Sequence, residues 1–367
     1  MPTKPPAATA LASADKPSPE VVADTVEEAM ARAGVSIAQS VLLFLSADFV
    51  RIAPQAVHAA SRAAQCLQVA GCTAHGVFTE TDWVMDRPAV GVMVFGDGIS
   101  LGGDRKDNAP RLSLALPRTV AKAWLDDPIP HCGLISTGIV GQDEGRIWGN
   151  GKVLAEQRFD ASFHGVRGAC GVSTGFRALG SAMEITAADG YELQRLDGAP
   201  ALATLLRELP LELREEPRLP HHLLAAAVLS GDEETAIEQG RFTPVPIIAA
   251  NLEEQSVTLA AQLAPATRIC WCVRQPLAAE CHTRHALLDA EARLGTTPDF
   301  ALMFSCIGRG PYFFGGRDRD LELIREGFPG LPIIGAYGSG QIAPLPPANH
   351  LIHNSAVIAL FAADVQS

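Results

Sequence analysis

The sequence predicts an α/β protein in two parts, with pseudo-duplicated mixed sheets flanked by helices and with β-hairpins in the middle of the chain. Two observations carry this prediction. Short apolar runs alternate with amphipathic segments, which is the pattern of buried strands and the helices that cover them. The order of segments near the start is repeated near the end, which indicates a duplicated βαβ-type unit. Two copies are too few for a solenoid, so a pseudo-symmetric protein is the better interpretation.

The clearer copy lies in the C-terminal part of the chain. Its apolar run at residues 301–305 has the length of a buried strand, and it stops at residues 306–311, where two glycines and a proline interrupt regular structure. An amphipathic segment, a second apolar run, a glycine-rich turn and a third apolar run follow. They occupy residues 318–327, 331–334, 335–342 and 354–361.

The same order occurs near the start, where a strand, an alanine-rich helix, a glycine turn and a strand are predicted at residues 41–46, 54–67, 71–76 and 90–95. The two glycine turns match at a constant offset, and this duplication favours a single cleft that both turns face. The matched pairs are Gly71 with Gly335, Thr73 with Tyr337, His75 with Ser339 and Gly76 with Gly340.

Turn residues mark two hairpins between the copies, at Asn150-Gly151 and at Asp189-Gly190. Helices are predicted at residues 19–34, with Gly34 as the C-terminal cap, and at 278–294. The remaining expectations are an exposed loop at residues 101–111, a helix at 118–127 and a loop of small residues at 131–138 whose backbone amides are free to approach a ligand.

Length and composition limit the class of protein. A chain of 367 residues with 47% apolar residues, 33 glycines and 26 prolines fits a turn-rich α/β protein with substantial cores. The 29 basic and 41 acidic residues give a formal charge of −12, so nucleic acid is not an expected partner. No apolar run reaches the roughly 18 residues that a membrane-spanning helix needs, so no membrane partner is expected either.

The first 20 residues are rich in alanine, proline and serine, and they predict a disordered lead. This segment lacks the apolar core of a signal peptide, so we expect a cytoplasmic protein. The eight cysteines are then expected to be thiols rather than disulfides.

Several phrases of the sequence, in order, resemble the FIST proteins, which have an N-terminal and a C-terminal FIST domain. The similarity extends from about residue 41 to the end of the chain. The most specific phrases are Phe-Ser-Cys-Ile-Gly-Arg-Gly at 304–310, Pro-Ile-Ile-Gly-Ala-Tyr-Gly-Ser-Gly at 332–340 and His353-Asn354. Weaker matches are Gly-Cys-Thr at 71–73, residues 185–186, residues 196–202 and Val273-Arg274.

The resemblance implies an intracellular sensor of small ligands, with amino acids as the proposed ligands and without a cofactor. It implies an N-terminal-type domain at residues 21–210 and a C-terminal-type domain at 221–367, joined by a proline-containing linker at 211–220. Some members carry an F-box and act in ubiquitin-dependent recognition, but the residues before the first strand show no such motif.

The chain departs from the family after each glycine turn, where members usually have Gly-Glu. This sequence has Gly76-Val77 and Gly340-Gln341 instead. If the family's carboxylates hold a ligand amine or a cation, the departure implies an altered specificity.

The strongest candidate site follows the strand at residues 301–305. Cys306 lies at the carboxyl end of that strand, where α/β sheets place ligands. Arg309, flanked by glycines, predicts a bidentate contact with a carboxylate or phosphate, and the amide of Gly310 adds to an anion-binding nest. In the opposing interpretation Cys306 is a small buried residue and Arg309 pairs with Asp318 or Asp320.

The predicted function is therefore a cytoplasmic sensor that binds a small, carboxylate-bearing metabolite at the junction of the repeats and signals to a downstream protein. The predicted binding residues are Gly71, Cys72, Thr73, His75, Gly76, Cys306, Arg309, Gly310, Tyr337, Gly340, Gln341 and Asn354.

Two other functions stay open. Cys306 with His353 forms a candidate thiol–imidazole pair for a hydrolase or acyl transferase, although no family-specific motif accompanies them. A protein-interaction adaptor without a small ligand would instead present a large exposed apolar patch.

A metal site is not expected. Cys270 and Cys272 point to one face of a predicted strand, and Cys281, His282 and His285 follow on a predicted helix. Their spacing fits no familiar zinc module, and the two strand cysteines suit a buried face.

Overall fold

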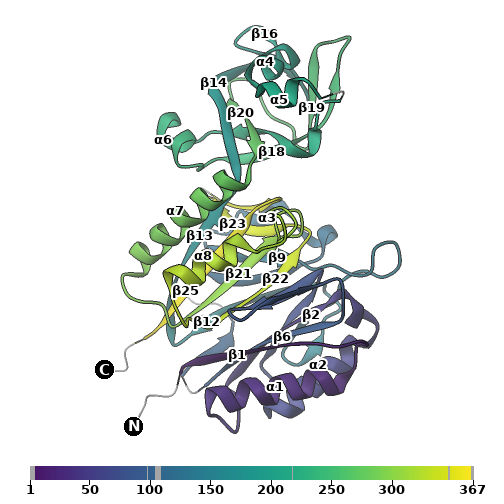
Figure 1. Cartoon of the computed structure of the whole chain (residues 1–367), viewed down its shortest axis with the longest axis vertical. Coiled ribbons are helices and arrows are strands. Elements are labelled where there is room, and N and C mark those ends of the chain that lie inside the picture. The colour runs from purple at the N-terminus through teal and green to yellow at the C-terminus, as the bar shows by residue number, and fades with distance from the viewer. Residues whose placement is uncertain (1–4, 97, 104–108, 217, 346–347, 365–367) are drawn as a thin grey trace. The chain divides into compact units, whose positions relative to one another are not determined.

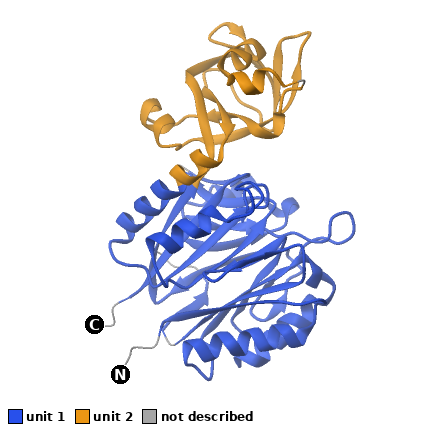
Figure 2. Cartoon of the chain, in the orientation of Figure 1, with its two compact units in different colours: residues 1–172, 283–367 blue, residues 173–282 orange. Residues whose placement is uncertain are grey.

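The computed structural model describes residues 5–96, 98–103, 109–216, 218–345 and 348–364. The chain forms two compact units, and each is described by itself (Figure 2). The first unit contains residues 1–172 and 283–367, and the second contains residues 173–282. The predicted fold class is confirmed: both units contain strands and helices, and the first is built from mixed sheets flanked by helices.

The N-terminal copy forms a six-stranded sheet in the order β1-β6-β2-β3-β10-β11. The strands are β1 (Ala7–Ser13), β6 (Ala89–Phe95), β2 (Ser40–Ser46), β3 (Val69–Ala74), β10 (Ile147–Gly149) and β11 (Lys152–Val153). Helices α1 (Pro19–Ala33) and α2 (Ala53–Ala64) pack side by side on one face, where their apolar residues share a core with Val41, Leu43 and Leu45 (Figure 1). Gly34 caps α1 with φ +66°, as predicted.

The C-terminal copy forms a second six-stranded sheet in the order β13-β25-β21-β22-β4-β5. The strands are β13 (Val166–Ser173), β25 (Ala356–Ala363), β21 (Phe300–Cys306), β22 (Ile333–Gly338), β4 (Gly76–Thr79) and β5 (Trp83–Met85). Helix α8 (Arg319–Gly327) and the later residues of α7 (Pro276–Leu294) pack on it through Leu287, Leu321 and Ile324.

The predicted duplication is present in the strand pairings. In one copy β2 is parallel to β3 and antiparallel to β6, and in the other β21 is parallel to β22 and antiparallel to β25. The copies also interlock, because β4 follows β3 in the chain but pairs with β22 of the other copy. The two halves of the sequence are therefore parts of one compact unit.

A third sheet completes this unit in the order β24-β23-β9-β8-β12-β7. Its strands are β24 (Ala348–Ile352), β23 (Gln341–Leu345), β9 (His131–Ile135), β8 (Arg111–Ala115), β12 (Arg158–His164) and β7 (Ser100–Gly102). One hydrophobic core takes side chains from all three sheets, including Phe44, Leu134 and Phe304. The hydrophobic effect, through burial of this core, is the main contribution that holds the three sheets together.

The second unit is an antiparallel β-barrel. Its strands run in the order β14-β20-β17-β18-β19-β15, and a further pairing of β14 with β15 closes the circle. They are β14 (Phe176–Asp189), β20 (Arg268–Arg274), β17 (Leu224–Val228), β18 (Thr243–Asn251), β19 (Ser256–Leu259) and β15 (Glu192–Leu196), with β16 (Ala199–Pro200) alongside β15. Apolar side chains fill the core, and the Trp271 indole donates a hydrogen bond to Thr204 of helix α4 (Ala201–Glu208) at 3.0 Å.

Short helices make up the connections. They are η1 (Ala47–Ile52), η2 (Pro117–Thr119) and α3 (Lys122–Leu125) in the first unit and α5 (Leu211–Arg214), η3 (His221–Leu223) and α6 (Glu233–Glu238) in the second. The hairpin at Asn150-Gly151 is confirmed, since both residues have positive φ, as a type I′ turn requires. The second predicted hairpin is present between β14 and β15, but its turn is Gly190-Tyr191 rather than Asp189-Gly190, because Asp189 pairs with Glu192.

Four predictions of local structure are wrong. Ala7–Ser13 is not a disordered lead but strand β1, because its small apolar residues pair with β6. The helix expected at residues 118–127 is reduced to η2 and α3, and residues 131–135 of the expected loop are the buried strand β9. Residues 71–74 of the expected glycine turn belong to β3, and Gly335 of the second turn belongs to β22. Residues 104–108 of the loop expected at 101–111 lie outside the described residues.

The two compact units divide the chain differently from the predicted domains. The expected linker at 211–220 begins with α5 inside the second unit, and residues 283–367 lie in the same unit as the N-terminal copy. The chain crosses between the units at positions 172–173 and 282–283, within β13 and α7.

Candidate functional site

The matched segments of the two copies lie side by side. The His75 backbone N–H donates to the Tyr337 carbonyl at 2.8 Å, and Gly76 of β4 is the register partner of Tyr337 in β22. The Gly340 carbonyl accepts from the N–H of Ile135 at 2.9 Å, which connects the second segment to β9. The prediction that the duplicated segments meet at one place therefore agrees with the strand pairing.

The strand glycines Gly71 and Gly335 serve packing. A Cβ atom on Gly335 would lie 2.1 Å from the Met303 carbonyl oxygen and 2.2 Å from Cζ of Phe78. A Cβ atom on Gly71, whose φ is +156°, would lie 1.7 Å from the Leu43 carbonyl oxygen. Neighbouring backbone and aromatic rings thus occupy the space beside these two glycines, where a ligand was predicted.

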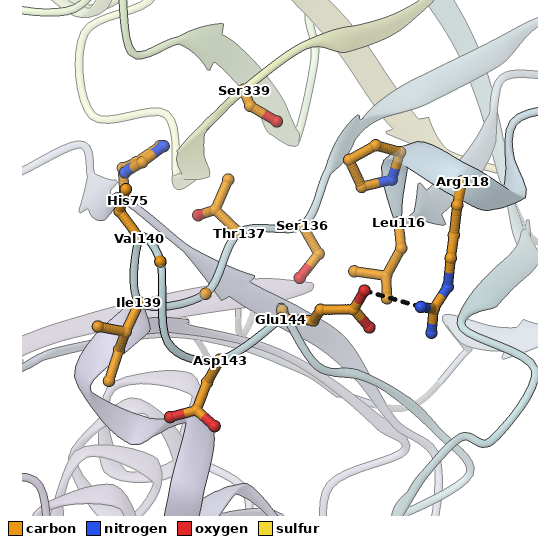
Figure 3. A pocket seen from close by; sticks show the side chains of 14 residues that line it. His75, Leu116, Arg118, Ser136, Thr137, Ile139, Val140, Asp143, Glu144 and Ser339 are labelled. Carbon is orange, nitrogen blue, oxygen red and sulfur yellow. Dashed lines mark hydrogen bonds and ion pairs between the residues drawn. The ribbon is translucent and has the colours of Figure 1, made fainter.

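A pocket of about 320 Å³ opens beside His75 and Ser339, the matched residues that follow β3 and β22 (Figure 3). The loop that follows β9 forms much of its wall. The lining residues are His75, Leu116, Pro117, Arg118, Ser136, Thr137, Gly138, Ile139, Val140, Gly141, Asp143, Glu144, Gly145 and Ser339. Its volume lies in the range of small-molecule sites, and its lining combines apolar groups with a few polar ones.

Hydrogen bonds between β3 and the β9 loop fix the base of this pocket. The Thr73 hydroxyl donates to the Thr137 carbonyl at 2.7 Å, and the Ser136 hydroxyl donates to the Thr73 carbonyl at 2.8 Å. Thr73, which was predicted to contact the ligand, is fully buried and holds the loop instead. The Arg146 backbone N–H also donates to the Thr73 hydroxyl, at 2.9 Å. The Thr73 hydroxyl therefore both donates and accepts a hydrogen bond within the protein.

Burial lowers the pKa of His75, and the carboxylate of Asp86 opposes that effect. Because desolvation is the larger cause, the imidazole is neutral at pH 7. It therefore presents one hydrogen-bond donor and one acceptor to the pocket rather than a positive charge.

Two ion pairs hold the outer part of the loop. Arg118 contacts Glu144 at 2.7 Å, and both side chains are more than half exposed. Arg51 contacts Asp143 at 2.8 Å. Exposed pairs of this kind contribute about 1 kcal/mol or less, so they can exchange partners at little cost.

Arg309 is the centre of a buried ion pair, as in the opposing interpretation. Its side chain is fully buried, and Nε and Nη2 contact the two carboxylate oxygens of Asp320 at 2.7 and 2.9 Å. Thr283 accepts from Nη2 at 2.9 Å and donates to Asp320 at 2.6 Å. The guanidinium is therefore used inside the protein, between the end of β21 and helix α8.

The neighbouring polar groups belong to the same buried cluster. Asp318 caps α8 by accepting from the Leu321 N–H at 2.9 Å, and the Tyr337 hydroxyl donates to its other oxygen. Gly310 lies against the Tyr337 ring, where a Cβ atom would come within 3.1 Å. Tyr337 is fully buried, so it contributes to the core between β22 and α8.

The proposed thiol–imidazole pair gains no support from the geometry. Cys306 is 4% exposed, and Cys72 is fully buried with its pKa raised by desolvation. His353 lies with Nδ1 2.9 Å from the Ser339 carbonyl, and Asn354 takes a left-handed φ of +57° at the turn before β25. The His353 ring is therefore bonded to the backbone at Ser339, and Asn354 serves the turn before β25.

Gln341 is fully buried, and both polar atoms of its carboxamide are without a hydrogen-bond partner among the described residues. Its counterpart Val77 is fully buried in the central core. A glutamate at either place would carry a charge into a fully buried environment, which is costly without a partner.

Cys270 and Cys272 share one buried face of β20 with Ala225 and Ala227 of β17. Within the described ranges no group of three or more His, Cys, Asp or Glu side chains is arranged to hold a metal ion. Over the same ranges, no helix is long and apolar enough to cross a membrane.

We expect the stability of the protein to depend on pH through Asp318. Desolvation, with the nearby charge of Asp320, raises the pKa of Asp318 from 3.8 to about 7, although Tyr337 and Arg309 oppose this shift. The folded state then binds a proton that the unfolded state releases, so the free energy of unfolding falls by a few kcal/mol as pH rises from about 4 to about 7. Urea denaturation across this window measures the slope.

Asp318→Asn is the control for this prediction, because an amide keeps the helix cap without a titrating group. The unfolding free energy of the wild type minus that of this variant should therefore fall by a few kcal/mol as pH rises from about 4 to about 7. Equal slopes for the two proteins would contradict a raised pKa at Asp318.

Part of this pocket was predictable from the sequence, namely His75, the matched position Ser339 and the small-residue segment at 131–138. Arg118 and Glu144 were not predicted, because they are distant in sequence and become neighbours only in the fold. No motif marks them, since ordinary exposed loops contain the same residue types.

Comparison with known proteins finds a family match in the C-terminal part of the chain. Residues 200–344 match the model of the FIST C domain, a stretch that starts in the barrel and ends in β23. An uncharacterized protein of Mycobacterium bovis is 28% identical over 323 residues, which covers 81% of this chain and 83% of the relative. An uncharacterized protein of Mycobacterium tuberculosis is 26% identical over 317 residues, covering 79% and 82%. A separate N-terminal FIST domain and the boundaries at 21–210 and 221–367 stay predictions.

Proposed function

Since the chain has a FIST C domain, we propose that it is a sensory signal-transduction protein whose ligand is a small polar metabolite, an amino acid or another small carboxylate. The ligand occupies the pocket beside His75 and Ser339. Binding there is passed on to a downstream signalling protein. The family's association with signal transduction supports the sensory role.

The observation that carries this proposal is the position of the pocket. It opens where equivalent segments of the two copies meet, and the matched residues His75 and Ser339 both line it. A ligand that contacts both segments gains affinity from both copies. Such a ligand also favours one arrangement of the two copies over another. A sensor requires this shift, because the arrangement of the copies reports that the ligand is bound.

The Arg118–Glu144 pair favours a zwitterion or a small carboxylate. A ligand carboxylate replaces Glu144 on Arg118, and a ligand ammonium satisfies the carboxylate of Glu144 that is released. The exchange costs little because both side chains are exposed and their pair is weak. Phosphorylated ligands are disfavoured, since Asp143 and Glu144 both lie on the wall and His75 is neutral.

A thermal-shift panel of the purified protein against amino acids, other small carboxylates and phosphorylated metabolites tests the proposal. A ligand at about 100 times its dissociation constant adds about 2.7 kcal/mol to stability, which is readily detected. We expect Arg118→Ala to weaken binding by about tenfold or more, because a charge-assisted hydrogen bond is lost.

Arg317→Ala is the matched control, because Arg317 is an exposed arginine paired with Glu322 at 2.8 Å, outside the pocket lining. This variant should bind like the wild type. A panel without any shift, or a ligand that binds Arg118→Ala as tightly as the wild type, would contradict the proposed site.

A further inference from the structure

One hydroxyl group of the pocket is buried without a partner. Thr137 is 8% exposed, and its Oγ1 makes no hydrogen bond within the described part of the chain. Thr137 lines the pocket, and its side chain lies between those of His75, Ser136 and Ser339 (Figure 3). Leaving a buried hydroxyl unpaired costs free energy, so such a group in a cavity needs a polar partner there.

The neighbouring hydroxyl groups have their partners within the protein. Thr73 donates to the Thr137 carbonyl, and Ser136 donates to the Thr73 carbonyl. Both side chains are fixed by bonds between β3 and the β9 loop. The unused hydrogen-bonding capacity of Thr137 is therefore specific to this position and is not shared by the whole polar base of the pocket.

The charged side chains of the pocket are paired within the protein. Glu144 and Arg118 are paired at an exposed place, and Asp143 is paired with Arg51. His75 is neutral at pH 7 because burial lowers its pKa. A charged ligand group placed at the Thr137 hydroxyl would be desolvated without a countercharge, whereas an uncharged polar group meets no such cost.

We infer that Thr137 determines the specificity of the pocket, and that the ligand presents an uncharged hydrogen-bonding group to it, namely a hydroxyl, a carboxamide or a carbonyl. This inference rests on the proposed function and narrows its ligand class to small polar metabolites with such a group. Thr137 acts by direct contact, while Thr73 and Ser136 hold the loop that positions it.

The free protein provides the first measurement. Thr137→Val keeps the shape of the side chain and removes an unpaired hydroxyl, so it should raise the melting temperature or leave it unchanged. Thr73→Val is the matched control, because it removes a hydroxyl that is bonded in the fold, and it should lower the melting temperature. A drop in Thr137→Val as large as that in Thr73→Val would overturn the inference, because the hydroxyl would then have a partner within the protein.

Ligand binding provides the second measurement, by calorimetry with pairs of probes that have nearly the same shape. The pairs are L-threonine with L-valine and L-asparagine with L-leucine. The wild type should bind the polar member of at least one pair about tenfold more tightly, and Thr137→Val should abolish that preference, as expected for a site built to pair a polar group. Thr137→Ser keeps the hydroxyl, so this variant should show the same preference for the polar probe as the wild type.

The outcomes separate the two proposals. If the wild type binds amino acids but prefers neither member of a pair, the inference about Thr137 fails while the proposed function stands. The same holds if the preference survives in Thr137→Val. If the wild type binds none of the four probes, the amino-acid function fails and this inference fails with it.

Discussion

Replacing Arg309 with alanine should destabilise the protein by about 3–5 kcal/mol, the usual effect of removing one partner from a buried ion pair. Asp320 would be left fully buried without its guanidinium, and Thr283 would lose a bond to Arg309 as well. Chemical denaturation of the variant and the wild type measures this loss. The same substitution should have little direct effect on ligand affinity, because Arg309 lies outside the pocket lining.

Arg317→Ala again serves as the control, since the Arg317 side chain is 70% exposed and its pair with Glu322 is weak. It should change the unfolding free energy by less than about 1 kcal/mol. If Arg309→Ala were as stable as Arg317→Ala and instead lost ligand binding, the anion-anchor interpretation of Arg309 would be restored.

Gly335→Ala is expected to have the second large effect, a loss of about 3 kcal/mol or a failure to fold. Its new methyl group would overlap the Met303 carbonyl of β21 and the Phe78 ring of β4. These neighbours come from both copies, so neither can move without disturbing the interlocked strands. Equilibrium denaturation measures the effect where the variant folds, and soluble yield reports it where the variant does not.

Gly327→Ala is the matched control, because it places a methyl group into open space at the end of α8. Its stability should equal or slightly exceed that of the wild type. A fully stable Gly335→Ala that had lost its ligand would show that the glycine makes room for a ligand rather than for Phe78.

The sequence predicted the strands and helices of both copies well, because their apolar periodicity is strong and local. The strand at 41–46, the helix that ends at Gly34 and the helix at 318–327 agree with β2, α1 and α8 within a few residues. The hairpin at Asn150-Gly151 was equally predictable, since its two positive φ angles have a direct residue signature. Strand β1 was not predicted, because its alanine-rich sequence lies in a stretch whose composition is typical of disordered segments. Only the pairing with β6 makes it a strand.

The candidate site was less predictable, because the roles of its residues depend on what lies opposite them. Gly335 was predicted to lie in a turn that faces a ligand, but whether the space above it holds a ligand or Phe78 depends on the crossing of β4 into the other copy. Arg309 could pair with a ligand or with Asp320, and the short path from β21 to α8 decided for Asp320. In both cases the residues nearby in the sequence do not indicate which partner is present in the fold.

By itself, the sequence determined the duplicated α/β pattern, the two hairpins and the matched segments that contain His75 and Ser339, since each follows from residue preferences over a few neighbouring positions. Only the tertiary structure decided that the two copies share one core, that Arg309 is an internal ion-pair partner, and that Arg118, Glu144 and Thr137 meet at one pocket. The reason is physical. Burial, pairing and cavity shape are set by contacts between residues far apart in the chain, which local periodicity does not encode.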